Sequence, residues 1–292
     1  MFAHIYNQLR KNRFVTSALV VLSFFIGWSI IISIVFSIWE NPSFIARNPA
    51  LLRLYWEIIP LIAIVGVTAF FVTKVSKKQV QVILAKHAKR DVLSGLVFGT
   101  FWALLASGLL AMTNTLKLTP NNTPSYLLVW LFALFCNAAM QELLVRGYIF
   151  SLIRHKFNVT AAIIVSTVLF VAMHGPDLGA YGLGMLNVIT ASLVFGLLLL
   201  VFEGLLVPIL VHFVWNILLG VLLGSIVLAD DYPSMYHAVF HGSAVITGGA
   251  MKIEGSLFTL ILNLLVLFGL VYYYRKGRAK LRPVTGALTC EK

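Results

Sequence analysis

Eight apolar segments, each near or above the length that a helix needs to cross a membrane, limit what this chain can fold into. A helix crosses the hydrocarbon core with about 20 consecutive apolar residues. The segments cover residues 14–39, 54–73, 92–114, 125–153, 160–174, 185–202, 205–228 and 256–274. We therefore predict an all-α, polytopic membrane protein of about eight transmembrane helices, of which the fifth and sixth are short, in one transmembrane domain over residues 1–292.

The composition agrees with this prediction. Of the 292 residues, 60% are apolar and only 11% are charged, whereas soluble domains carry about 25% charged residues. This composition excludes an ordinary soluble globule and a disordered chain. The first apolar run is far longer than the apolar region of about 7–15 residues in a signal peptide, so we expect a retained span. The two cysteines, Cys136 and Cys290, form no disulfide framework.

The 22 Lys and Arg residues are distributed unevenly among the loops. If the N-terminus is cytosolic, 17 of them lie on the cytosolic side and four on the other, and Arg146 lies within a span. Because basic residues favour cytoplasmic loops, we predict that both termini of this multi-pass protein are cytosolic. The compactness of the chain and its spans rich in Phe, Ile and Leu favour a bacterial plasma membrane. The basic tail, residues 275–292, should contact anionic lipid. In a soluble protein a net charge of +12 would suggest nucleic acid, but in these loops it is an orientation signal, so we expect no nucleic-acid partner.

Polar residues gather in the middle of the fourth segment. Ionisable residues inside spans are rare and are functional candidates. Glu142 and Arg146 are four residues apart, so they share one helix face and can pair. Asn137 and Gln141 have the same spacing beside them. A structural ion pair that ties this helix to a neighbour is the alternative interpretation of Glu142 and Arg146.

Two further spans carry histidines. His174 ends the fifth segment, where a purely structural histidine is the alternative. His212 and Asn216 share a face of the seventh segment, and an interhelical hydrogen bond would also explain them.

Four other polar residues are weaker candidates. His237 and His241 have a spacing that suits a metal on a helix, but their surroundings predict a loop and no third ligand is evident. Glu57 and Glu203 lie near predicted span ends, and we expect them at the membrane interface.

The depths of the candidate residues suggest that they meet. At about 1.5 Å per residue, Glu142 lies about 18 Å and His174 about 21 Å from the cytosolic ends of their helices. His212 and Asn216 lie about 12 and 18 Å from the same side. A carboxylate, two imidazoles and an amide can take a proton from water and stabilise an oxyanion. The same groups could instead hold a divalent metal.

At this point the residues resemble a known family, the CAAX protease and bacteriocin-processing (CPBP) intramembrane proteases, which include the Ras-converting CAAX endopeptidases. The motifs that carry the resemblance are Gln141-Glu142-Leu-Leu-Val-Arg146, Phe170-Val-Ala-Met-His174 and His212-Phe-Val-Trp-Asn216. They lie within residues 125–225, which we expect to form a four-helix catalytic core.

The resemblance implies an intramembrane endopeptidase that acts on peptide or membrane-anchored protein substrates within the lipid bilayer. By resemblance, His174 orients or activates water, and His212 and Asn216 stabilise the oxyanion. Arg146 neutralises Glu142 and fixes its rotamer. In a bacterium the resemblance implies peptide maturation or self-protection against bacteriocins.

One position departs from the family pattern. Gln141 occupies the place of the first motif glutamate, the expected general base, and an amide cannot take up a proton at working pH. Three explanations remain: Glu142 serves as the base, the protein binds without cutting as an immunity or regulatory factor, or Gln141 is an engineered substitution. We favour the first, because the other motif positions are intact.

Cofactor use and access are also open at this stage. Glu142, His174 and His212 could supply three zinc ligands, but Asn216 is a poor zinc ligand, so we favour chemistry that requires no cofactor. A transporter is a third hypothesis, which predicts an internal repeat that we do not find. The motif depths place the site toward the outer face, so we expect either a deep cytosolic cavity or entry from outside or from lipid.

Overall fold

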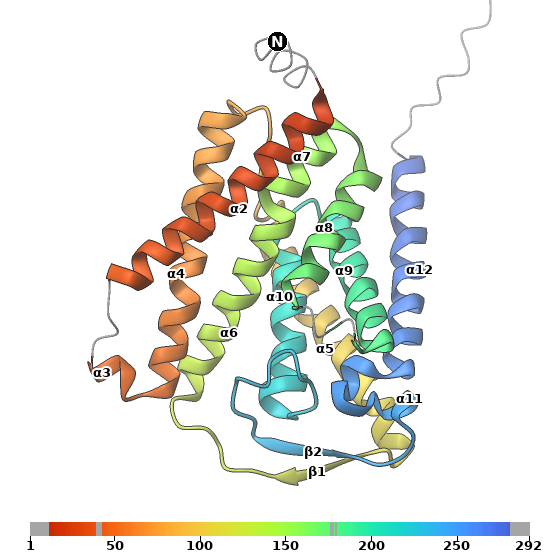
Figure 1. Cartoon of the computed structure of the whole chain (residues 1–292). Helices are drawn as coiled ribbons and strands as arrows, with labels where there is room; N and C mark the ends of the chain where they lie inside the picture. The colour runs from red at the N-terminus through yellow and green to blue at the C-terminus, as the bar shows by residue number, and fades with distance from the viewer. Residues whose placement is uncertain (1–11, 39–42, 176–177, 179, 281–292) are drawn as a thin grey trace, which may run out of the picture.

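The computed structural model describes residues 12–38, 43–175, 178 and 180–280, and these are mainly helical (Figure 1). The helices are α2 (Arg13–Ile38), α3 (Ser43–Ala46), α4 (Pro49–Phe70), α5 (Ala88–Met112), α6 (Leu127–Glu142), α7 (Tyr148–Lys156), α8 (Val159–Met173), α9 (Gly182–Phe202), α10 (Leu206–Trp215), α11 (Ala244–Thr247) and α12 (Leu257–Lys280). Three π-helical turns, η1 (Phe71–Val75), η2 (Leu143–Gly147) and η4 (Asn216–Leu222), and one 3-10 segment, η5 (Gly249–Gly255), extend or join them.

Six helical segments of the described chain are long and apolar enough to cross a membrane. Two shorter apolar helices, Val159–Met173 and Leu206–Leu222, accompany them. The prediction of an all-α polytopic membrane fold is thereby confirmed. The sixth predicted span is longer than expected, because α9 begins at Gly182, and the seventh is shorter, because its helix ends at Leu222.

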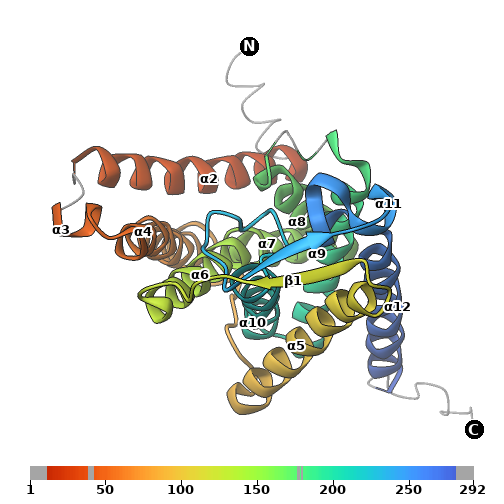
Figure 2. The ribbon, with the colours of Figure 1, turned by 90° about the horizontal axis from the view of Figure 1, so that it is seen from below.

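Helix α10 lies at the centre of the bundle and packs against α5, α6 and α9 (Figure 2). Two glycines on α5 permit its close approach. A Cβ atom at Gly95 would lie 2.7 Å from Leu210 Cβ, and one at Gly99 would lie 2.9 Å from Val214 Cβ. Small residues spaced four apart let membrane helices approach closely in this way. These glycines therefore help to position the helix that carries His212.

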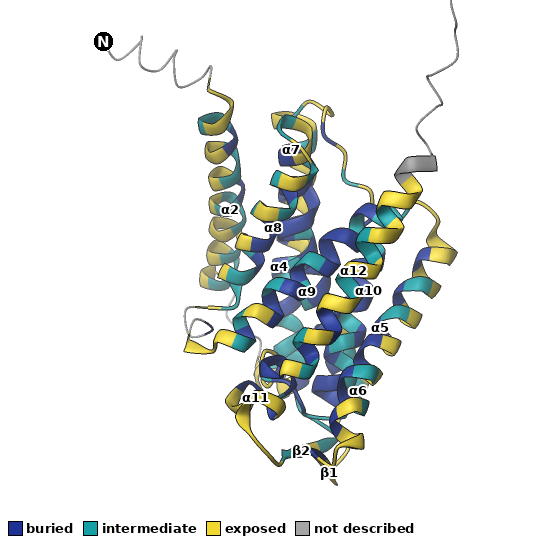
Figure 3. Ribbon diagram, turned by 90° about the vertical axis from the view of Figure 1, so that its right-hand side faces the viewer, coloured by how far each residue is buried: buried dark blue, intermediate teal, exposed yellow. Residues whose placement is uncertain are grey.

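Burial decreases from this centre outwards (Figure 3). Most residues of α9 and α10 are at least partly covered, whereas α2 buries only Ser17 and Phe24 and crosses the edge of the bundle obliquely (Figure 2). In a membrane protein the exposed apolar face of α2 is suited to contact with lipid.

A two-stranded antiparallel sheet covers one end of the bundle (Figure 1). Strand β1 (Leu116–Pro120) pairs with β2 (Tyr236–Phe240), so that Leu116 lies opposite Phe240. The sequence analysis predicted loops here. His237 lies in β2, and both His237 and His241 are exposed.

The start of α2 and the end of α12 lie at the other end of the bundle, with the turn between α7 and α8 (Figure 1). These segments carry Arg13, Arg154, Lys156 and Arg275. These basic residues, which the sequence analysis assigned to one side of the membrane, therefore lie at one end of the folded molecule. The cytosolic location of the basic end stays a prediction, and the tail from residue 281 onward lies outside the described residues.

Candidate active site

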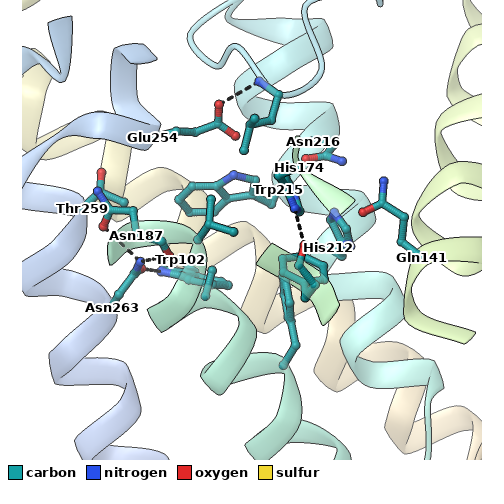
Figure 4. A pocket seen from close by; sticks show the side chains of 15 residues that line it. Trp102, Gln141, His174, Asn187, His212, Trp215, Asn216, Glu254, Thr259 and Asn263 are labelled. Atoms are coloured by element: carbon teal, nitrogen blue, oxygen red, sulfur yellow. Dashed lines mark hydrogen bonds between the residues drawn. The ribbon is translucent and has the colours of Figure 1, made fainter. Parts of the chain in front are cut away.

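Four of the six predicted site residues line one cavity of about 60 Å³ in the bundle, namely Gln141, His174, His212 and Asn216 (Figure 4). Its other lining residues come from six elements and the loop before β2. They are Trp102, Phe170, Asn187, Val188, Ala191, Phe195, Trp215, Leu228, Glu254, Thr259 and Asn263. The motifs on α6, α8 and α10 therefore converge as the depth argument predicted.

The other two predicted residues, Glu142 and Arg146, form a fully buried ion pair beside this cavity. Arg146 Nη1 donates to both carboxylate oxygens of Glu142, at 2.9 and 2.8 Å. Arg146 Nη2 donates to the carbonyl oxygen of Ser192 at 3.0 Å and to its hydroxyl at 2.5 Å. The arginine therefore joins α6 to α9. The π-helical turn η2 begins directly after Glu142, and such turns are frequent at functional sites.

Two aromatic rings enclose the guanidinium group. Arg146 Cζ lies 4.7 Å from the ring centroid of Phe170 and 5.3 Å from that of Phe195. Cations are attracted to aromatic faces, and more strongly where water is excluded. The motif phenylalanine on α8 therefore contributes to holding the buried charge.

Glu142 also holds His212. The Nδ1 atom of His212 lies 3.2 Å from Glu142 Oε1, and the imidazole ring stacks on Phe195 with centroids 5.1 Å apart. Because an ionised carboxylate only accepts hydrogen bonds, we assign the proton to Nδ1. The Nε2 atom of a neutral His212 then carries the free lone pair.

His174 is held in the same tautomer by a different partner. Its Nδ1 lies 2.7 Å from the carbonyl oxygen of Phe170 (Figure 4), and a carbonyl can only accept. The Nε2 atom of His174 is therefore also left as an acceptor. Both imidazoles are fixed through Nδ1, and both line the same cavity.

Gln141 presents its amide oxygen to the cavity, because a chain of hydrogen bonds sets the direction of its amide. Its Nε2 donates to Asn137 Oδ1 at 2.8 Å, and Asn137 Nδ2 donates to Glu57 Oε2 at 2.9 Å. A carboxylate at the end of this chain cannot donate, so neither amide can be flipped. The remaining atom, Gln141 Oε1, is buried and has no partner among the described residues.

Glu57 is buried within the protein, and its position at the membrane interface stays a prediction. It is only 5% exposed, because Arg53, Asn137 and Tyr232 surround its carboxylate. Arg53 Nη2 lies 2.6 Å from Glu57 Oε1, and Arg53 also pairs with Asp231. Burial raises the pKa of Tyr232, so its hydroxyl keeps the proton that it donates to Glu57 at 3.2 Å. Glu203 is exposed and pairs with Lys86.

The described residues contain no group of three or more His, Cys, Asp or Glu that could hold a metal ion. Both oxygens of Glu142 already accept from Arg146, and one is also in contact with His212. The proposed set of Glu142, His174 and His212 is therefore not arranged as a metal site.

Sequence reasoning missed the residues at the far side of the cavity. Asn187 and Asn263 lie in apolar segments, and Thr259 and Glu254 lie at the start of the last one. The search concentrated on ionisable groups in the middle of spans. Amides within apolar runs would have been a usable signal for two of these four residues.

Comparison with known proteins agrees with the geometry. Residues 123–218, about one third of the chain, match the family described as Rce1-like, type II CAAX prenyl endopeptidase Rce1-like. No curated protein and no solved structure matches the chain. The matched segment contains all six predicted site residues, and the match supports a protease activity. The suspected resemblance is confirmed over this segment: residues 123–218 of this polytopic membrane protein match the Rce1-like, type II CAAX prenyl endopeptidase family.

Proposed function

We propose that this protein is an intramembrane endopeptidase that hydrolyses peptide or membrane-anchored protein substrates. One observation carries the proposal: two imidazoles, each fixed through Nδ1, line one small cavity together with an unpartnered amide oxygen. This arrangement lies in the segment that matches a protease family.

In the proposed mechanism the cavity holds the attacking water. Gln141 Oε1 accepts a hydrogen bond from it, and the Nε2 atoms of His174 and His212 are the available proton acceptors. We assign the proton transfer to His212, because Glu142 stabilises the imidazolium that forms. The hydroxide attacks the scissile carbonyl, and His212 then returns the proton to the leaving amine nitrogen. Asn216 is suited to donate to the oxyanion.

Glu142 then acts through His212 rather than on water. It does not line the cavity, and its oxygens are occupied by Arg146 and His212. We therefore assign Glu142 and Arg146 as positioning residues. This modifies the sequence-based hypothesis that Glu142 itself replaces the missing general base.

The residues that line the cavity suggest that the substrate enters from the end of the bundle that carries β1 and β2. Leu228 and Glu254 line it, and both belong to the segments between η4 and α12 at that end. With the predicted orientation this end faces away from the cytosol. A His174→Cys variant should react with a membrane-impermeant thiol reagent added outside the cell, and reaction only from the cytosolic side would contradict this entry route.

Peptide cleavage by the purified protein tests the proposal. A panel of fluorogenic and membrane-anchored peptides should contain substrates that the wild type cleaves. His212→Ala should lower the rate by at least about 100-fold, because His212 carries the proton transfer. His237→Ala is the matched control, because His237 is exposed in β2 and should have no effect. Equal rates for wild type and His212→Ala would reject the proposed chemistry.

The second candidate function is a binding protein of the same family that no longer cuts, such as an immunity or regulatory factor. Gln141 favours it, because an amide cannot serve as a general base. Gln141→Glu separates the two functions. A gain of cleavage from an inactive wild type supports the binding protein, whereas a wild type that already cleaves supports the endopeptidase.

A further inference from the structure

The cavity has a second polar end, opposite the histidines, that the proposed mechanism does not use. Four residues from η5, α9 and α12 form it: Glu254, Thr259, Asn187 and Asn263 (Figure 4). We propose that this distal end is a substrate subsite for a compact ammonium group, such as a lysine side chain. The inference rests on the proposed function, because it names the side chain that the endopeptidase selects.

The hydroxyl of Thr259 lacks a partner. Thr259 is 1% exposed, and its Oγ1 forms no hydrogen bond with the described residues. Buried polar atoms are almost always hydrogen-bonded, so an unpartnered one that lines a cavity suggests a ligand atom. The same cavity contains the other groups that such a ligand would contact.

Glu254 offers a carboxylate oxygen to the cavity. Its Oε2 accepts the backbone N–H groups of Val227 and Leu228, at 2.8 and 2.9 Å. The other oxygen, Oε1, has no hydrogen-bond partner in the described part of the chain. No Lys or Arg among the described residues pairs with Glu254, and Lys252 Nζ donates to the carbonyl oxygen of Gly224 instead. Buried charges are normally paired, so a cationic ligand would supply the missing partner.

The two asparagines are held in place by hydrogen bonds of their own. Asn263 Oδ1 accepts from Trp102 Nε1 at 3.1 Å, and Asn263 Nδ2 donates to Thr190 Oγ1 at 3.0 Å. Asn187 Nδ2 donates to the carbonyl oxygen of Ser256 at 3.0 Å. These bonds join α5, α9 and α12 and form a fixed wall of the subsite.

The segment that carries Glu254 is held in place before any ligand arrives. Ile253 N donates to the carbonyl oxygen of Ser225 at 3.2 Å. Gly248 turns the chain with φ +85°, and a Cβ atom there would lie 1.6 Å from the carbonyl oxygen of Lys252. A carboxylate that is already oriented loses little entropy on binding, which favours affinity.

Two tryptophans favour a cation over a neutral donor. Trp102 and Trp215 both line the cavity, with ring centroids 4.8 Å apart, and Trp215 lies between Glu254 and His212 in Figure 4. Indole rings are the most effective aromatic partners of cations. The small volume of the cavity favours the compact ammonium group over the planar guanidinium. A substrate whose scissile carbonyl lies at His174 and His212 would thus place the side chain of a neighbouring lysine at the distal end of the cavity.

Paired peptides test the subsite. Each pair carries lysine or the uncharged norleucine at one position beside the scissile bond. At one position the wild type should cleave the lysine peptide with a kcat/KM at least about tenfold higher. Glu254→Gln keeps an acceptor for the two backbone N–H groups and should bring this ratio close to one. Glu203→Gln is the matched control, because this exposed carboxylate lies outside the cavity.

A binding measurement separates the subsite from the proposed function. Equilibrium dialysis of the same peptides against the His212→Ala protein, which should not cleave them, should show tighter binding of the lysine peptide. A lysine preference in binding without cleavage by the wild type would reject the endopeptidase and support the subsite. If Glu254→Gln does not fold, Thr259→Val should lower the lysine preference at nearly constant shape. Lysine-to-norleucine ratios near one in both assays would overturn the subsite.

Discussion

Two ion pairs of this protein, one fully buried and one partly buried, look alike in sequence and differ in the residues that they contact. Arg53 and Glu57 lie four residues apart on α4, and Glu142 and Arg146 have the same spacing in the helix of α6 and η2. Each pair stacks on one helix face, and each reaches a second helix. The difference lies in the third partner.

Glu142 contacts the imidazole of His212, which lines the cavity. Glu57 contacts the amide of Asn137, which does not line the cavity but accepts a hydrogen bond from Gln141, which does. The Glu142 pair is completely enclosed by α9 and two aromatic rings. The Arg53 pair extends to Asp231, whose side chain is half exposed. The comparison shows that spacing predicts the pairing within a helix, whereas the neighbouring helices decide which further partners the pair contacts.

Glu142→Gln should give the largest effect. Removal of one partner of a buried ion pair costs about 3–5 kcal/mol, because Arg146 is left uncompensated. It also releases His212, so cleavage should fall by at least about 100-fold. Denaturation in detergent and peptide cleavage measure the two losses. The double variant Glu142→Leu with Arg146→Met should recover stability but not cleavage, and unchanged cleavage in Glu142→Gln would end the hypothesis.

Glu57→Gln should have a smaller effect on both properties. Arg53 keeps Asp231 as a partner, and the new amide can still accept from Asn137, so we expect a loss of about 1–2 kcal/mol. The amides of Asn137 and Gln141 become free to flip, which should lower kcat by less than about tenfold. The cleavage rates of Glu57→Gln and Glu142→Gln, measured side by side, provide the comparison. A loss as large as that of Glu142→Gln would show that the two pairs are equivalent.

Tyr232→Phe should give the smallest effect. It removes one hydrogen bond to Glu57 and leaves the ring that lies 4.4 Å from Arg53 Cζ. We expect a destabilisation of about 1 kcal/mol and nearly unchanged cleavage. Chemical denaturation of the purified protein measures it. A large loss of activity would mean that the cluster of Arg53, Glu57 and Tyr232 acts directly on the candidate active site.

Much of the candidate site could be predicted from sequence, because its residues have helical spacing on spans of predictable depth. The pairing of Glu142 with Arg146 and the convergence of His174 with His212 follow from such local rules. The partners of Glu57 do not, because its contact with Asn137 depends on how α4 packs against α6. The five-residue strands β1 and β2 and the position of Glu254 depend on long connections at one end of the bundle. Such contacts have no periodic signal in the chain.

The central claim is that Glu142 acts on the reaction through His212. A double-mutant cycle of Glu142→Gln and His212→Ala, read as single-turnover cleavage rates of one peptide, tests it most directly. Residues that act as a unit give non-additive losses. The account predicts that the double variant is no slower than His212→Ala alone. A double variant slowed by the product of the two single losses would contradict it, because Glu142 would then act independently of His212.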